Sequence, residues 1–362
     1  MKLLSLRKIY LLSCFLLLIG CGGSSNIVAT YEVPEKTNDG WNVSPASEVG
    51  LDIDILSTLS NSLQTNQYPG TDSFLVVKNG LLVQELYFNN YNRNKVHDLR
   101  SATKSITSAL VGIAIDQGVI ENVNQAALAS ISGYTEIDNW DDRKNNIKIK
   151  HLLTMSSGLA CDDSDFSSAG NEEYMYRQQD WVKFILDLQQ TSKPGNKWAY
   201  CTGGVVSLGA IIEDSSGLQT EDFATQYLFE PLGISNYHWE FTPTGRVDTG
   251  GHIHMTPRDM AKIGQLFLQQ GLWNGQTLIS KQWVAESTTV QILTNQGYHY
   301  GYLWWRGRID SHDFYYAGGN GGQFITIMPS LNMVVVSTAQ NYNSNLSSQF
   351  FILLKTLIDA AL

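Results

Sequence analysis

Residues typical of β-strands are grouped in two blocks near opposite ends of the chain, and a long region with helical spacing separates them. The first block, 73–88, contains two apolar runs joined by Asn79-Gly80, a dipeptide that favours a two-residue hairpin turn. The second block, from Tyr300 to Thr338, alternates or runs apolar between turns. We therefore predict an α+β fold in which both chain ends form one antiparallel sheet, flanked by helices, with an all-α region inserted between them.

Apolar spacing and end signals locate the helices. Apolar residues recur at helical intervals from Asp52 to Leu63, and a run from Ser101 to about Gln117 is followed by a glycine. The stretch 256–259 combines a threonine N-cap, a proline in the first turn and an acid three residues after the cap. Further helices are predicted at 147–155, 180–188, 205–213, 220–229 and 349–362.

The first twenty residues have the pattern of an export signal. Lys2, Arg7 and Lys8 precede an apolar run, 9–19, that is too short to span a membrane as a mature helix. The end of this run resembles the bacterial lipobox, in which cleavage precedes a lipidated cysteine, here Cys21. An ordinary secretory signal is the alternative. We expect a lipoprotein signal peptide at 1–20, a tether and extended arm at 21–50, and one globular domain at 51–362.

The charge balance argues against a nucleic-acid partner. The chain has 24 basic and 34 acidic residues, whereas nucleic-acid-binding surfaces are basic. Removing the signal takes away three positive charges and no negative one, so the mature chain is more acidic still. Anionic membranes repel such a surface, and we expect membrane attachment only through the lipid on Cys21. The protein is thus expected to be exported and anchored to the bacterial cell envelope, on the periplasmic side or at the outer membrane.

Four cysteines reduce to two candidates for a disulfide. Cys14 lies in the signal and Cys21 is assigned to the lipid, which leaves Cys161 and Cys201. Disulfides persist outside the cytoplasm. The count suggests one bridge, and two buried thiols are the alternative.

Ser101 and Lys104 lie three residues apart on the predicted helix. Side chains at this spacing share a face, with Cβ atoms about 5–6 Å apart, so a neutral Lys104 amine can take the proton of the Ser101 hydroxyl. This is activation of a nucleophile by an adjacent base. The alternative role for Ser101 is a helix N-cap. The same spacing at Ser5 and Lys8, inside the signal, shows that the pair alone is not specific.

Two further stretches have features of a catalytic site. A Pro-Gly turn at 194–195 brings Tyr200 onto a loop just before a helix, and the glycine-rich turn 318–322 lets backbone N–H groups approach a ligand closely. His252 and His254 are spaced like metal ligands, but no third ligand cluster accompanies them. We therefore expect no metal and no cofactor.

Taken together, these motifs resemble the serine hydrolases of the β-lactamase and penicillin-binding-protein superfamily. The resemblance is to the branch of class C β-lactamases, related esterases and 6-aminohexanoate-dimer hydrolases. The three motifs occur in the family's order, the segment 151–159 is similar to that branch's H-L-L-T-M-T-S-G-L, and 300–305 is similar to Y-G-Y-x-W-W. The resemblance covers roughly 52–362 and implies a β-lactamase-like fold.

The resemblance also implies a role for each motif. Ser101 matches the acylated nucleophile, Lys104 its partner base, and Tyr200 the tyrosine of Y-x-N, which shares the proton transfer. Gly319 follows the position of the K-T-G glycine, so its backbone N–H and that of Ser101 would form the oxyanion hole. Removing one such donor typically costs about 2.7–4 kcal/mol in an acyl-transfer enzyme.

The role of Lys104 as a base sets a condition on its pKa. A lysine titrates near ~10.4 in water, so a base near pH 7 needs its pKa lowered by ~3 units. Burial and the Tyr200 hydroxyl could supply this, and we expect a buried, largely neutral Lys104.

In the resembled fold, the segments containing Cys161 and Cys201 both line the active site, which implies a disulfide that steadies the tyrosine loop.

Departures from the family pattern bear on the substrate. Y-x-N has become Tyr200-Cys201-Thr202, without the side-chain amide, and Tyr316 and Ala317 stand where K-T-G has lysine and threonine. The groups that would hold the carboxylate of a β-lactam or peptide are therefore absent. The expected substrate-binding residues are Thr202, Trp304, Trp305, Tyr316 and Asn320, although strand alternation lets only one of the two adjacent tryptophans face a pocket.

The predicted activity is hydrolysis of a small-molecule carboxylic ester or small amide through an acyl-enzyme on Ser101. A β-lactamase or D-Ala-D-Ala carboxypeptidase is the alternative among enzymes. A non-catalytic binding homologue is the alternative outside enzymes.

Overall fold

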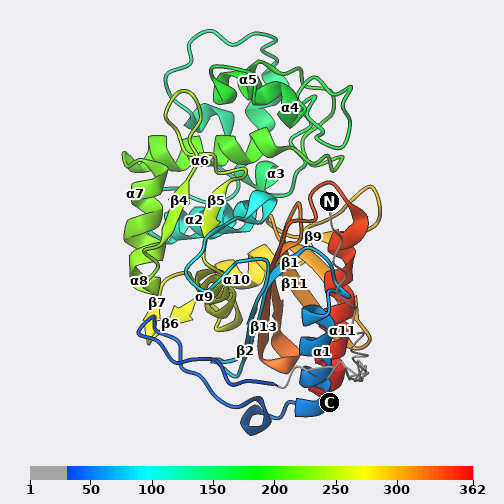
Figure 1. Ribbon diagram of the computed structural model, residues 1–362. Coiled ribbons are helices and arrows are strands. Elements are labelled where there is room, and N and C mark those ends of the chain that lie inside the picture. The colour runs from blue at the N-terminus through cyan, green and yellow to red at the C-terminus, as the bar shows by residue number, and fades with distance from the viewer. Residues whose placement is uncertain (1–30, 362) are drawn as a thin grey trace, which may run out of the picture.

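A computed structural model describes residues 31–361, which are built around one eight-stranded sheet (Figure 1). The strand order is β2-β1-β13-β12-β11-β10-β9-β8, and neighbouring strands pair antiparallel. Both ends of the chain contribute, so the predicted sheet is confirmed. Its strands are β1 (Thr71–Lys78), β2 (Leu81–Tyr87), β8 (Ile292–Leu293), β9 (His299–Tyr300), β10 (Trp305–Ile309), β11 (His312–Gly319), β12 (Gln323–Met328) and β13 (Met333–Ala339).

The predicted hairpin forms between β1 and β2. Asn79 and Gly80 have φ angles of 54° and 79°, the positive values that a two-residue turn between twisted strands requires. β1 is an interior strand, second from the edge of the sheet, because β13 pairs with its other side. The first and last strands of the chain therefore share one buried core.

Helices cover both faces of the sheet. α1 (Ile53–Gln64) and α11 (Gln349–Ala360) pack together on the outer face (Figure 1). α9 (Pro257–Leu268) packs against β12, β13 and β1 on the other. Local signals start these helices as predicted: the Asp52 carboxylate accepts the backbone N–H groups of Asp54 and Ile55, and the Thr256 hydroxyl accepts that of Asp259.

The inserted helical region lies at one end of the sheet (Figure 1). α2 and α6 pack against each other there and place the segments of interest for function. The remaining helices are α2 (Thr103–Asp116), α3 (Ile149–Leu153), α4 (Glu172–Met175), α5 (Trp181–Asp187), α6 (Thr202–Ser216), α7 (Thr220–Ala224), α8 (Glu230–Leu232) and α10 (Lys281–Thr288). Short strands pair as β3 (His97–Asp98), β5 (Ile253–Met255) and β4 (Tyr237–Trp239), and as β6 (Leu272–Trp273) with β7 (Gln276–Thr277).

Two predicted elements differ in the structure. The first helix of the insert begins at Thr103, and Ser101 lies in a 3₁₀ turn (Arg100–Ala102) that leads into it. The run 300–305 is two strand ends separated by a loop. Leu303 in that loop has φ 62°, and its carbonyl oxygen accepts a hydrogen bond from the Ser105 hydroxyl at 2.6 Å. The loop is therefore drawn onto α2 instead of continuing the strand.

The segment that precedes α1 lies along the body of the molecule. Trp41 is buried, its ring meets that of Trp273 edge-on, and its indole N–H donates to the carbonyl oxygen of Arg258 at 3.1 Å. The predicted signal peptide and Cys21 fall outside the described residues. Within 31–361, none of the helices has the length and apolar character needed to cross a membrane.

Candidate active site

Ser101 and Lys104 are within hydrogen-bond distance of each other. Lys104 Nζ donates to Ser101 Oγ at 3.1 Å and to the carbonyl oxygen of Gly250 at 2.6 Å. Residues 103–114 of α2 are all buried, whereas Ser101 is partly exposed. The core thus fixes the lysine, and the serine hydroxyl remains accessible beside it.

The charge state of Lys104 differs from the expectation. Burial disfavours its ammonium form, but the coulombic effects of Tyr200, Glu172, Asp163 and Asp248 more than offset burial and raise the pKa of Lys104 above its ordinary value. The prediction that Lys104 is buried is correct, and the prediction that it is neutral in the free protein is wrong. The difference arises from three carboxylates that lie far from Lys104 in the sequence.

Lys104 and Tyr200 are close enough for their charges to interact. Lys104 Nζ lies 5.0 Å from the centroid of the Tyr200 ring. Removing one proton from a lysine–tyrosine pair leaves either a neutral lysine beside a phenol or an ammonium beside a phenolate, and the two arrangements belong to one macroscopic protonation state. The negative charges around Lys104 favour its ammonium form. This ammonium can stabilise negative charge on Ser101 Oγ.

A loop that sequence reasoning did not single out fixes Lys104. The carboxylate of Asp248 accepts the backbone N–H groups of Gly250 and Gly251, each at 3.0 Å, and so shapes the turn whose Gly250 carbonyl meets the lysine. Asp248 is fully buried, and its second oxygen, Oδ2, has no hydrogen-bond partner. An Asp shortly before Gly-Gly is a turn signal that could have marked this loop.

Gly319 lies directly against the turn that contains Ser101. A Cβ at Gly319 would be 2.2 Å from the carbonyl oxygen of Leu99 and 3.2 Å from the backbone nitrogen of Ala102. Only glycine permits this approach of β11 to the 3₁₀ turn. The arrangement brings the backbone of Gly319 beside that of Ser101, where the resemblance places the two donors of an oxyanion hole.

Tyr200 belongs to a cluster of aromatic rings. Its ring is nearly parallel to that of Trp305 at 6.3 Å between centroids, and Trp305 is nearly parallel to Tyr316 at 6.4 Å. Trp305 and Tyr316 are directly paired on β10 and β11, so their side chains share one face of the sheet. Tyr200, Trp305 and Tyr316 are each partly exposed. We call these three residues the aromatic row.

The other three residues expected to bind substrate have contacts of their own. Trp304 is fully buried and packs on Phe267, since the loop before β10 turns it into the core. Thr202 is fully buried as well, and its hydroxyl donates to Glu172 at 2.7 Å. Asn320 is exposed, but its side chain is hydrogen-bonded to Asn343 on the neighbouring loop. Of the five, Trp305 stacks on Tyr200, and Tyr316 stacks on Trp305.

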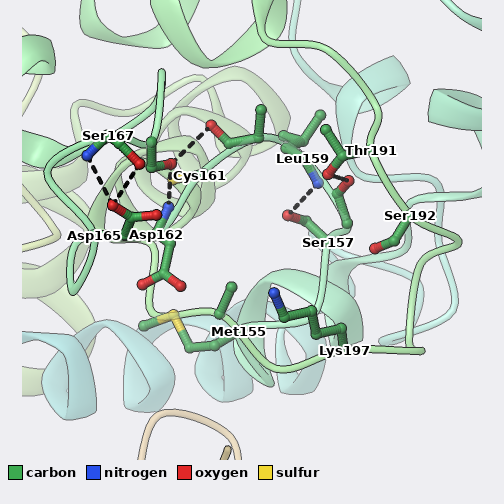
Figure 2. Close-up of a pocket in the computed structure, with 14 residues that line it drawn as sticks. Met155, Ser157, Leu159, Cys161, Asp162, Asp165, Ser167, Thr191, Ser192 and Lys197 are labelled. Carbon is green, nitrogen blue, oxygen red and sulfur yellow. Dashed lines mark hydrogen bonds between the residues drawn. The ribbon is translucent and has the colours of Figure 1, made fainter.

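Cys161 and Cys201 form a disulfide in the structure, with their Cα atoms 5.4 Å apart. The bridge is next to Tyr200 in the chain, as the resemblance implied. A polar cavity of about 200 Å³ lies beside it, lined by Met155, Cys161, Asp162, Lys197 and other residues of the same loops (Figure 2). Figure 2 shows Lys197 and Met155 on one side of this cavity and the loop containing Asp162 on another.

Backbone strain is concentrated around the same site. Four residues other than glycine and asparagine with positive φ angles lie on the segments that converge there: Arg100 (49°), Met155 (55°), His252 (60°) and Leu303 (62°). Each such conformation costs of order 1–3 kcal/mol and persists only where the surroundings impose it. Arg100 directly precedes Ser101, so the turn that presents the hydroxyl is itself strained.

The two histidines noted in the sequence have separate contacts. His252 Nδ1 lies 3.0 Å from Asp98 Oδ2, and burial, which lowers the His252 pKa, is outweighed by this carboxylate, so that pKa is raised. His254 stacks on His238. Within 31–361, His, Cys, Asp and Glu side chains form no group of three or more suited to a metal ion.

Comparison with known proteins places the chain in a family. The family model described as Beta-lactamase matches residues 57–349. The chain is 22% identical over 322 residues to the 6-aminohexanoate-dimer hydrolase of Paenarthrobacter ureafaciens, which covers 81% of this chain and 78% of that protein. A solved structure of similar fold is that of a family VIII carboxylesterase, with a TM-score of 0.68 and 14% identity, and the match covers 84% of this chain and 96% of that one. Another is a penicillin-binding protein from Bacillus halodurans, with a TM-score of 0.63 and 16% identity, and the match covers 82% of this chain and 98% of that one. The chain belongs to the β-lactamase family of hydrolases.

Proposed function

We propose that the protein is a serine hydrolase that cleaves a carboxylic ester or a small amide through an acyl-enzyme on Ser101. The observation that carries this proposal is the contact between Lys104 Nζ and a partly exposed Ser101 hydroxyl, next to a glycine packed against the nucleophile's own turn. A binding homologue needs neither an accessible hydroxyl held by a buried ammonium nor a strained backbone beneath it.

The reaction divides the work among three groups. The Tyr200 phenolate takes the proton of Ser101 while the Lys104 ammonium stabilises the developing charge on Oγ. The oxygen attacks the acyl carbon, and the backbone N–H groups of Ser101 and Gly319 bind the oxyanion. Collapse of this intermediate breaks the bond to the leaving group, which takes the proton from Tyr200. A water molecule then cleaves the acyl-enzyme by the same proton transfers, and Ser101 is regenerated.

The substrate class follows from what surrounds the nucleophile. Tyr316 and Ala317 stand on β11 where the resembled family has lysine and threonine, so β11 lacks the ammonium and the threonine hydroxyl that would bind the carboxylate of a β-lactam or peptide. The aromatic row instead offers flat apolar surface next to Tyr200. The similarity to a 6-aminohexanoate-dimer hydrolase and to a carboxylesterase supports a neutral amide or ester as the bond that is cleaved.

An active-site serine probe tests the proposal. A fluorophosphonate should add once to the wild type, as read by intact mass, and should not add to Ser101→Ala. Absence of labelling in a folded wild type would contradict the proposal and favour the binding homologue. Parallel assays with a short-chain ester, a cyclic amide oligomer and a cephalosporin should then give turnover of the first or second, and faster turnover of the cephalosporin would favour the β-lactamase alternative.

We also propose that the protein is exported and anchored through a lipid on Cys21. This location is supported by the basic residues at the start of the chain, the short apolar run that follows them, and the cysteine after that run. The wild type should partition into detergent and Cys21→Ser should not. Equal partitioning of the two would favour an ordinary secretory signal.

A further inference from the structure

Three separate links join the segment 161–163 to the segment 200–202. The backbone N–H of Asp163 donates to the carbonyl oxygen of Tyr200 at 2.7 Å. The backbone N–H of Thr202 donates to Asp163 Oδ2 at 2.6 Å. Between these hydrogen bonds, Cys161 is joined to Cys201. Tyr200 is therefore held from its own carbonyl and from the next two residues of the chain.

We propose that Asp163 is a positioning residue for Tyr200, and that its backbone N–H and carboxylate, together with the Cys161–Cys201 disulfide, form a clamp that sets where the phenolic oxygen meets Ser101. The proposal rests on the function proposed above, because it concerns the proton transfer at Ser101. It assigns Asp163 no contact with the substrate.

The clamp matters because the segment that contains Tyr200 is only partly enclosed. The rings of Trp198 and Trp305 pack near that of Tyr200. Cys161 and Ala199 line the cavity of Figure 2. Cys201 and Thr202 are buried, whereas Tyr200 itself is partly exposed, so specific bonds to the segment 161–163 add to packing in setting its position.

The carboxylate holds the clamp only while it is ionised. Asp163 Oδ1 accepts the backbone N–H of Glu172 at 2.8 Å while Oδ2 accepts that of Thr202, so both oxygens are used as acceptors. A proton on either oxygen removes the negative charge and weakens these charge-assisted bonds. Burial and the charge of Glu172 raise the pKa of Asp163 to about 6, although Lys104 lowers it.

Several charged or titratable groups face Asp163 from the neighbouring elements. Lys104 extends from α2, Glu172 lies on α4, and Tyr176 directly follows that helix. The clamp should therefore loosen as the pH falls through about 6. We expect the acid limb of the pH profile of kcat to have its midpoint there.

Asp163→Asn is the main test, with Asp162→Asn as the matched control. The Asn amide cannot accept at both positions, so kcat for an ester substrate at pH 7.5 should fall about tenfold or more, with KM nearly unchanged. The acid limb near pH 6 should disappear. Asp162 is the adjacent acid, and its carboxylate accepts only the backbone N–H of Ser164, so its variant should keep both the wild-type kcat and the limb. An unchanged kcat or an unchanged acid limb in Asp163→Asn would overturn the proposal.

A second variant separates the disulfide from the carboxylate. Replacing Cys161 and Cys201 together by serine removes the covalent link and leaves Asp163 in place. This variant should lower kcat and keep an acid limb. If kcat is unaffected, the disulfide is not part of the clamp.

Hydrogen exchange keeps the test independent of activity. Exchange of the peptide 199–204, measured by mass spectrometry at one pH, should be faster in Asp163→Asn than in the wild type and in Asp162→Asn. Equal exchange in all three proteins contradicts the clamp even if the enzyme is active. Conversely, faster exchange in a protein whose wild type does not react with the serine probe supports the clamp and contradicts the proposed function.

Discussion

Two of the buried lysines, Lys104 and Lys144, share one local geometry and differ in charge environment. Lys104 Nζ donates to the carbonyl oxygen of Gly250 at 2.6 Å, and Lys144 Nζ donates to that of Leu186 at 2.7 Å. Burial lowers the pKa of Lys144, and the acids near it only partly oppose this. For Lys104, the nearby negative charges outweigh burial and raise the pKa.

The difference shows that burial does not by itself make a lysine neutral. Both ammonium groups lie in the interior, and both have a carbonyl acceptor. Only Lys104 also has a serine hydroxyl as a hydrogen-bond acceptor, at 3.1 Å, and a layer of carboxylates behind it. We infer that Lys144 serves only the stability of the fold. The acids around Lys104 keep its side chain positively charged, beside the place where the proposed reaction forms a negatively charged oxygen.

Replacing each lysine by methionine tests this contrast most directly. Lys104→Met keeps the length of the side chain and removes the charge, so kcat should fall by about 10³-fold or more. Lys144→Met loses one hydrogen bond far from the chemistry and should keep kcat within about threefold, at some cost in stability. Esterase kinetics and thermal unfolding of both variants check this. Similar kcat losses in two folded variants would abolish the distinction.

A substitution at Gly319 tests whether backbone N–H groups, in addition to the Lys104 ammonium, stabilise the negative charge that forms in the reaction. A Cβ at this position would meet the Leu99 carbonyl at 2.2 Å and push β11 away from the nucleophile's turn. We expect Gly319→Ala to lower kcat by about 10²–10³-fold. The matched control is Gly318→Ala on the same strand, whose Cβ would have its nearest contact, 3.2 Å away, on the Tyr316 ring. If kcat survives in Gly319→Ala, this glycine does not build the oxyanion hole.

Local patterns predicted the elements of the fold, because their causes are local. The Asn79-Gly80 turn and the caps at Asp52 and Thr256 each depend on a few consecutive residues. The pair Ser101 and Lys104 was found for the same reason. The family resemblance added Tyr200 and Gly319, which neither spacing nor composition could join to that pair.

What the sequence could not show depends on distant contacts. Gly250 meets Lys104 across 146 residues, and the carboxylates that set its charge come from the same loop, through Asp248, and from Asp163 and Glu172. Strand alternation could not decide which tryptophan faces the site, because the chain leaves the strand pattern at Leu303. Trp304 consequently enters the core, and Trp305 stacks on Tyr200.

The pH dependence of stability measures how strongly the acids around Lys104 are perturbed. The folded-state pKa of Asp163 is about 6, above its ordinary 3.8, so the folded protein holds this proton more tightly than the unfolded chain. The stability that it contributes is present below pH 4 and is lost as the pH rises through 6, about 3 kcal/mol in all. Urea unfolding between pH 4 and 7.5 should show this decline in the wild type and a flatter curve in Asp163→Asn. Parallel curves would mean that Asp163 titrates normally.

Asp248→Asn offers the finest comparison, because it changes the charge near Lys104 and little else. The Asn oxygen can still accept from Gly250 and Gly251, so the turn is kept, and the oxygen that is replaced has no partner. Removing this negative charge lowers the pKa of Lys104, and the Lys104–Tyr200 pair then loses its first proton at lower pH. The rise of kcat/KM with pH should therefore shift to lower pH, with a several-fold gain at pH 7. Asp187→Asn, which removes an acid near Lys144, should leave the profile in place. A profile that does not move in Asp248→Asn would show that the carboxylates do not control the protonation of the reacting pair.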